Sequence, residues 1–202
     1  MKSIIFADKS TVQLVHCVGF NDKSYPAKIK GKNTKEYRLW SQMLQRCYNK
    51  TYHTKQPTYI GCSVSDNFKN YSYFHEWCQN QVGFDLDDWQ LDKDIITFGN
   101  KVYSEDTCVF VPREINTFFI ERGADRGTYP IGVSFHRKTG KYQANCSVYG
   151  KKKYLGLFPN PELAYTAYKL FKESLCKETA AIWKSRVDTR VYTALIDWRV
   201  PE

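Results

Sequence analysis

The sequence predicts an α+β fold, with helices and antiparallel strands in different parts of the chain. Between residues 34 and 47, apolar residues recur at intervals of three and four, which is the spacing of one helix face. Between residues 131 and 158, three runs of alternating apolar and polar residues are separated by turn residues, which is typical of an antiparallel meander. A chain of 202 residues can bury the core of one ordinary domain or of two small ones.

Composition excludes several classes of protein. Hydrophobic residues make up 42% and charged residues 25%, so the chain is neither wholly disordered nor a collagen-like or coiled-coil fibre. No run of 18 apolar residues occurs, and Asp8 interrupts the first apolar residues too early for a signal peptide. We therefore expect a cytoplasmic protein with no membrane partner.

Basic and acidic residues are distributed unevenly along the chain. The formal charge of +9 divides into +8 for residues 1–60, −7 for residues 61–125, +9 for residues 126–190 and −1 for the rest. Basic segments favour a polyanionic partner, whereas an acidic centre repels nucleic acid unless cations bind there. The pattern predicts segments with different tasks, the first of them a basic N-terminal segment over residues 1–35.

The cysteines favour a reducing compartment. The seven are dispersed, with no C-x-x-C pair, and the four histidines are equally scattered. A zinc site would need four ligands from distant positions, so we expect buried free thiols.

Two helices are expected in the first half of the chain. Thr34 is a suitable N-cap for a helix that carries Trp40, Leu44 and other apolar residues on one face. A second helix is expected over residues 71–81, with its aromatic residues on one side.

A hairpin followed by a helix is expected between residues 91 and 119. Residues 91–96 and 108–111 are predicted strands, residues 98–101 a turn, and Pro112 can open the helix. Five aspartates lie just before or within the first strand: Asp85, Asp87, Asp88, Asp92 and Asp94.

A segment rich in glycine and charged residues follows, and we predict a linker over residues 123–129. Beyond it, strands are expected over residues 131–136, 141–148 and 153–158, and then a helix over residues 161–176 capped by Asn160. Residues 187–200 are predicted to form a closing helix. Three strands packed on one helix make a minimal two-layer domain.

The meander presents a polar, basic face. Side chains alternate along a strand, so Ala144 and Cys146 should face the helix, together with Val133 and Phe135. The opposite face and its turns carry amides, hydroxyls and cations, which are the groups that read base edges and bind phosphates in DNA. The alternative is a solvated sheet face with scattered lysines. The predicted DNA-binding residues are Ser134, His136, Arg137, Lys138, Lys141, Gln143, Asn145, Lys151, Lys152 and Lys153.

Four segments of this region, Gly132–Phe135, Thr139–Ala144, Gly150–Phe158 and Ala164–Tyr168, together resemble the APETALA or ethylene-response-factor type DNA-binding domain. The resemblance implies a domain over residues 130–184 whose three-stranded sheet reads the major groove of double-stranded DNA, followed by a helical extension over residues 185–202. Ser134 or His136 stands where the plant domain usually has arginine.

The hairpin region resembles the HNH nuclease fold of phage homing endonucleases, over residues 36–122. The resemblance is carried by Leu91–Asp94, Asn100, Tyr103–Cys108 and Asn116, and upstream by Arg38–Trp40, Arg46–Asn49 and Tyr59–Val64. In that family the hairpin and helix hold one divalent ion, such as Mg²⁺, and a histidine activates water.

Carried over by position, the resemblance implies Asp92 and Asn116 as metal ligands and Asp92, Lys93, Asn100 and Asn116 as catalytic residues. Lys93 stands where the histidine base belongs, and an ordinary lysine is protonated and cannot accept the proton of water. No histidine occurs from residue 91 to residue 119, and the nearest, His75, would have to reach the site through folding.

Two functions therefore remain open. The first is a metal-dependent endonuclease or nickase guided by the C-terminal sheet. The second is a non-catalytic DNA-binding regulator, or an inhibitor of a host transcription or defence protein, in which the hairpin is only a scaffold. Both include double-stranded DNA as partner, and a phage-encoded chain would act in the host cytoplasm. A third alternative is a protein inhibitor that binds through the acidic centre.

Overall fold

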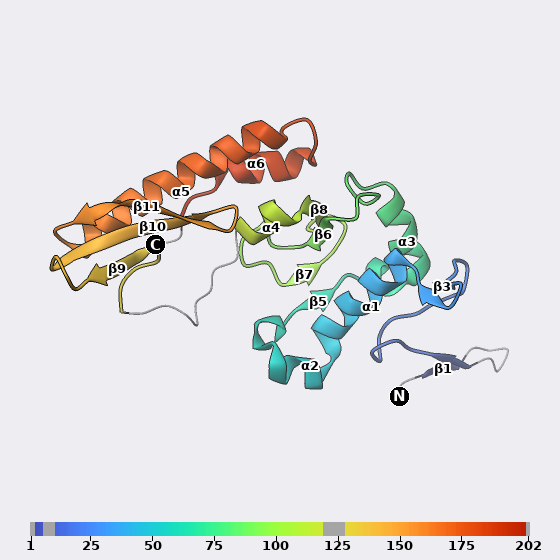
Figure 1. Cartoon of the computed structure of the whole chain (residues 1–202). Coiled ribbons are helices and arrows are strands. Elements are labelled where there is room, and N and C mark those ends of the chain that lie inside the picture. The colour runs from blue at the N-terminus through green and yellow to red at the C-terminus, as the bar shows by residue number, and fades with distance from the viewer. Residues whose placement is uncertain (1–2, 6–10, 119–127, 201–202) are drawn as a thin grey trace. The chain divides into compact units, whose positions relative to one another are not determined.

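A computed structural model describes residues 3–5, 11–118 and 128–200 (Figure 1). The chain divides into two compact units, Met1–Val111 and Pro112–Glu202. Both helices and antiparallel strands are present, as an α+β fold requires, and the second unit contains a three-stranded sheet packed on a helix. The fold-class prediction is confirmed. The expected linker lies mostly within residues 119–127, outside the described residues.

The described residues of the first unit form three helices, two short 3-10 helices and four small pairs of strands. The pairs are β1 with β2, β3 with β4, β5 with β7 in parallel, and β6 with β8. The elements of this unit, in chain order, are β1 (Ser3–Ile5), β2 (Thr11–Gln13), β3 (Lys28–Ile29), β4 (Lys32–Asn33), α1 (Lys35–Tyr48), α2 (Lys50–Lys55), η1 (Pro57–Tyr59), β5 (Ser63–Val64), η2 (Asn67–Lys69), α3 (Tyr71–Gln79), β6 (Trp89–Asp92), β7 (Val102–Tyr103) and β8 (Val109–Pro112, whose last residue is assigned to the second unit).

Aromatic side chains form the core of the first unit. Trp40 of α1 is fully buried, lies 5.3 Å from the ring of Tyr71, and donates a hydrogen bond of 2.8 Å from Nε1 to the carbonyl oxygen of Phe68. The ring of Phe68 meets that of Phe74 edge to face at 5.1 Å. Burial of these large rings, together with their favourable edge contacts, holds α1 and α3 against each other.

Side-chain caps determine where these helices begin and end. The predicted cap is confirmed, because Oγ1 of Thr34 accepts a hydrogen bond of 3.2 Å from the N–H of Tyr37. Helix α3 ends at Gln79, two residues earlier than predicted. The amide side chains of Asn80 and Gln81 donate to carbonyl oxygens of the last turn, which satisfies the helix end without further turns.

The predicted hairpin strand also ends early. Strand β6 stops at Asp92, because Oδ1 of Asp92 accepts hydrogen bonds from the N–H groups of Asp94 (2.8 Å) and Ile95 (2.7 Å). A side chain that hydrogen-bonds the backbone two or three residues ahead forms a turn in place of a strand. The pairing of β6 with β8 is as expected.

The second unit contains the antiparallel sheet in the order β11–β10–β9 (Figure 1). Helix α5 packs along the sheet, and α6 packs on α5. Helix α5 extends seven residues past the predicted end at Cys176, since no glycine or proline interrupts the chain between Glu162 and Trp183. The elements of this unit are α4 (Arg113–Phe118), β9 (Val133–His136), β10 (Lys141–Val148), β11 (Lys151–Phe158), α5 (Pro161–Trp183) and α6 (Thr189–Asp197).

A two-residue turn joins β10 to β11. Tyr149 and Gly150 both have positive φ, of 47° and 79°, which is the backbone shape of a tight hairpin turn. Strand β11 therefore begins at Lys151, two residues earlier than predicted, so Lys151 and Lys152 belong to the strand. A bulge lies opposite Ala144 and Asn145, where the register with β11 shifts.

The core of the second unit lies between the sheet and α5. Ala144 and Cys146 of β10 are buried, as predicted, and Cys146 forms a cluster with Tyr168 of α5 and Val200. Phe135 lies on the same side, next to Tyr142, but remains 45% exposed because β9 is an edge strand.

Two further sequence expectations concern thiols and membranes. All seven cysteines are free, and six of them are buried. In the described parts of the chain, no helix is both long and apolar enough to cross a bilayer.

We predict that Gly132→Ala destabilises the protein more than Gly140→Ala does. Both glycines have positive φ (78° and 65°), where alanine is strained. A Cβ at residue 132 would overlap the ring of Tyr168, whereas nothing lies within 4 Å of one at residue 140. Overpacking should lower the free energy of unfolding of Gly132→Ala by a further 1–3 kcal/mol, roughly. Urea denaturation measures both; equal losses would contradict the packing of α5 on the sheet.

Candidate nucleic-acid interface and hairpin cluster

The side of the sheet that faces away from α5 carries most of the predicted DNA-binding residues. Directly paired residues lie on the same face of an antiparallel sheet, so the register groups the side chains. Lys141 pairs with His136, and Gln143 pairs with Ser134. Ser147 pairs with Lys152. We call this side the outward face; it consists of Ser134, His136, Lys141, Gln143, Asn145, Ser147, Lys152, Tyr154 and Leu157.

Arg137 and Lys138 lie in the turn between β9 and β10 and are exposed. That turn is tied together at His136, whose Nδ1 lies 2.9 Å from Oγ1 of Thr139 and whose carbonyl oxygen accepts from the N–H of Gly140 at 3.1 Å. The two cations therefore extend from an ordered turn at the end of the outward face.

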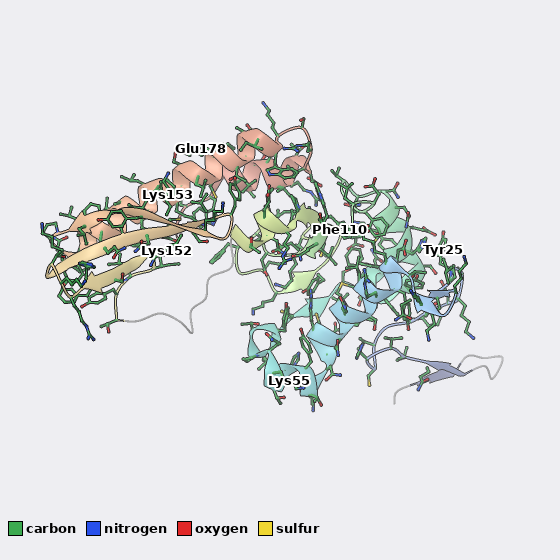
Figure 2. The ribbon with its side chains drawn as sticks, viewed as in Figure 1. Tyr25, Lys55, Phe110, Lys152, Lys153 and Glu178 are labelled. Carbon is green, nitrogen blue, oxygen red and sulfur yellow. The ribbon has the colours of Figure 1, made fainter. Side chains whose placement is uncertain are left out.

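Lys153 lies on the other side of the sheet. It pairs with the buried Cys146, and its Nζ is 4.6 Å from the centre of the Phe171 ring of α5. Lys152 is on the outward face (Figure 2). Lys151, at the start of β11, pairs with Val148 in the helix-side register and is exposed. Of the three consecutive lysines Lys151, Lys152 and Lys153, only Lys152 belongs to the outward face.

Two amide side chains lie at the centre of the outward face. Gln143 donates from Nε2 to Oδ1 of Asn145 at 3.0 Å, and both side chains are half-buried by their neighbours. This hydrogen bond orients the pair and leaves the Gln143 carbonyl oxygen and the Asn145 amide hydrogens for other partners.

Tyr154 is a further residue of the outward face that the sequence did not predict; it is 56% exposed and pairs with Asn145. The bulge hides this position from simple alternation, because it inserts Leu155 into the helix-side cluster and shifts the strand by one residue. The sequence signal for the bulge is Gly156, whose φ is 138°.

In the first unit, three predicted site residues form the hairpin cluster: Asp92, Lys93 and Asn100. Lys93 is only 6% exposed. Its Nζ donates to Oδ1 of Asp94 and to the carbonyl oxygen of Asn100, each at 2.5 Å, and lies 5.6 Å from the centre of the Tyr103 ring. An ammonium group that donates to a carboxylate and a carbonyl has no lone pair with which to deprotonate water.

Asn100 fixes the loop around Lys93. Its Nδ2 donates to the carbonyl oxygens of Lys93 (2.8 Å) and Val102 (2.7 Å), and its Oδ1 accepts from the N–H of Val102 at 3.1 Å. Both ends of the amide are thus used in backbone contacts, so Asn100 positions Lys93. Asn116, the remaining predicted residue, is a half-buried residue of α4 in the second unit.

His75 lies in different surroundings from Lys93. Its ring stacks on Tyr25 at 3.8 Å and meets Tyr71 edge to face, and Nε2 lies 3.9 Å from a carboxylate oxygen of Glu36. Tyr25 precedes α1, Glu36 belongs to α1, and Tyr71 lies one turn earlier in α3, so folding gives His75 a packing role on α3.

The first-unit residues of the predicted metal site do not suit Mg²⁺. A hard divalent cation requires several oxygen ligands. Oδ1 of Asp92 already accepts two backbone hydrogen bonds, and Asp94 is paired with the ammonium of Lys93, whose charge would repel a second cation. Burial raises the pKa of Asp92 above its ordinary value, although the two backbone hydrogen bonds act in the opposite direction. Within the described ranges, no three His, Cys, Asp or Glu side chains gather where they could hold a metal ion.

Comparison with known proteins gives no match: no family model, no curated protein and no solved structure matches this chain.

We predict that Asp92→Asn gains stability relative to the wild type as the pH rises. Because the pKa of Asp92 is higher in the folded chain, the stability from its protonated form is present below about pH 4 and is lost as the pH rises through the folded pKa. Asparagine stays neutral and keeps the acceptor for both backbone N–H groups. Urea denaturation at acid and neutral pH measures the difference; a difference that is constant or falls with pH would contradict burial as the larger influence on the pKa of Asp92.

Proposed function

We propose that this protein binds double-stranded DNA through the outward face of β9–β10–β11. One observation carries the proposal: between Pro130 and Phe158 the chain has six lysine and arginine residues and no aspartate or glutamate. Four of these cations are exposed on the outward face (Lys141 and Lys152) or in its turn (Arg137 and Lys138), whereas Lys151 and Lys153 lie in the helix-side register. A surface with cations and no carboxylates attracts phosphates, whereas an ordinary solvated face has charges of both signs.

The dimensions of the sheet suit a groove of duplex DNA. Neighbouring strands lie about 4.8 Å apart, so the outer strands of a three-stranded sheet are roughly 10 Å apart. The major groove of B-DNA is about 12 Å wide and admits strands. Helix α5 lies on the other face, so it leaves the outward face open to the duplex.

The groups on this face have two roles, contact with phosphates and contact with bases. Positive charge for phosphates comes from Arg137, Lys138, Lys141 and Lys152. A tyrosine hydroxyl such as that of Tyr154 can also donate a hydrogen bond to a phosphate oxygen. Gln143 and Asn145 are amides at the centre, and an amide can pair with the N6 and N7 atoms of adenine. The exposed cations thus position the duplex and the central pair reads it.

We further propose that the hairpin cluster stabilises the first unit and does not hydrolyse DNA. The support is the geometry of Lys93, whose ammonium donates to the Asp94 carboxylate and to the carbonyl oxygen of Asn100. In the nuclease family that the hairpin resembles, a histidine base occupies this position. Asn100 and Asp92 hydrogen-bond the same loop. Each group of the cluster is therefore used in folding.

Removal of two outward cations should weaken duplex binding. For Lys141→Ala combined with Lys152→Ala, we expect affinity to fall roughly tenfold per lysine near 0.1 M salt, and the slope of log K against log salt to become about 2 units shallower. Fluorescence anisotropy with a labelled duplex measures both.

A matched control removes the same charge from the helix side. Lys169→Ala with Lys177→Ala changes two lysines of α5, outside the outward face. We expect this variant to bind nearly as the wild type does. Equal losses from the two double variants would indicate that only net charge matters and would contradict the interface.

Incubation of supercoiled plasmid with the protein and Mg²⁺ or Mn²⁺ should give no nicked or linear product. The reason is that Lys93 offers no acceptor for the proton of water. Gel electrophoresis measures the products. Cleavage that disappears in Asp92→Ala would contradict the scaffold role and restore the nuclease hypothesis.

A further inference from the structure

A short exposed ribbon projects from the first unit. Strands β3 and β4 pair Lys28 with Asn33 and Ile29 with Lys32, and Lys30 and Gly31 form the turn with φ of 50° and 77°. All six residues are exposed, and Ile29 is 58% exposed. Two successive positive φ values produce a turn whose twist matches that of a hairpin. We call residues 28–33 the lysine ribbon.

The base of the ribbon is firmly held, although two strands of this length are marginal alone. The N–H of Thr34 donates to the carbonyl oxygen of Ala27 at 3.0 Å, and the Tyr71 hydroxyl donates to that of Pro26 at 3.3 Å. Tyr25, labelled in Figure 2, stacks on His75 and donates from its hydroxyl to Glu76 at 3.0 Å. These contacts clamp the ribbon to α1 and α3 and leave its tip in solvent.

The charged side chains within residues 23–35 are all basic. Residues 23–35 contain five lysines and no aspartate or glutamate. Lys35 is used internally, since its Nζ donates to the carbonyl oxygens of Phe84 and Leu86. The other four, Lys23, Lys28, Lys30 and Lys32, are exposed, and none of them forms an ion pair with a described residue.

Two of these lysines occupy a backbone conformation that lysine disfavours. Lys23 and Lys30 have φ of 66° and 50°, in the left-handed region where glycine, asparagine or aspartate is less strained. Strain of this kind clusters at functional sites, which supports a task for the side chain. At Lys30 the side chain is at the tip of the ribbon, and its distinctive property is its charge.

We propose that the lysine ribbon is a second DNA-binding surface, which holds phosphates of the same duplex that the sheet reads. The inference rests on the proposed duplex binding. Phosphate contacts of this kind add affinity and salt dependence without sequence preference.

The test separates charge from backbone strain. Lys30→Asn keeps a residue that tolerates positive φ and removes the charge, so its urea midpoint should be no lower than that of the wild type. Its affinity for a labelled duplex of about 30 base pairs should fall severalfold. The triple change Lys28→Ala, Lys30→Asn, Lys32→Ala should make the salt slope shallower by about 3 units.

A matched control removes lysines from another exposed part of the same unit. Lys50→Ala with Lys55→Ala changes both ends of α2, where Lys55 is labelled in Figure 2, and we expect little effect on duplex binding. Ribbon variants that bind like this control, while Lys141→Ala with Lys152→Ala weakens binding, would overturn the ribbon proposal alone. Loss from the ribbon variants with no loss from the sheet variant would support the ribbon and overturn the sheet.

Vesicles that contain phosphatidylserine serve as the alternative polyanion. We expect weak binding that the ribbon variants do not change. Ribbon-dependent binding to vesicles, with duplex binding unchanged, would overturn DNA as the partner of the ribbon.

Discussion

The packing of α5 on one side of β9–β10–β11 is the constraint on which the proposed interface depends. Ala144 and Cys146 are buried beneath the helix, and Tyr168 of α5 fills the space beside Gly132. Because side chains alternate along β10, burial of these two residues turns Gln143 and Asn145 to the opposite side. One register therefore determines both the core and the polar face, and a shift of one residue would exchange them.

The hairpin cluster illustrates how a charged side chain can be committed to structure. Lys93 is buried, and its ammonium requires acceptors, which Asp94 and the carbonyl oxygen of Asn100 supply. Asn100 in turn binds the backbone of Lys93, so the two residues fix each other. A divalent ion would have to compete with this ammonium for the same carboxylate. The arrangement favours a stabilising loop over a hydrolytic centre.

Much of the fold follows from local patterns, and the exceptions have physical causes. Thr34 and Asn160 were predicted as caps because side-chain oxygen next to an apolar periodicity is a local signal, and both accept the expected backbone hydrogen bonds. The predicted ends of β6 and α3 were wrong by a few residues. The side chains of Asp92 and Asn80 hydrogen-bond backbone groups there, and the spacing of apolar residues gives no sign of such bonds. The position of Lys153 and the exposure of Tyr154 depend on pairing and on a bulge between strands, which are tertiary facts. The roles proposed for these residues in DNA binding remain predictions.

We propose that duplex DNA lies on the outward face and not on α5. The most direct measurement is an NMR titration of the ¹⁵N-labelled full chain with a short duplex. We expect the largest chemical-shift changes at residues of the outward face such as Ser134, Gln143, Asn145 and Lys152, with little change at the exposed α5 residues Leu163 and Leu170. Changes concentrated on α5, or none in the second unit at duplex concentrations that saturate the protein, would contradict the account.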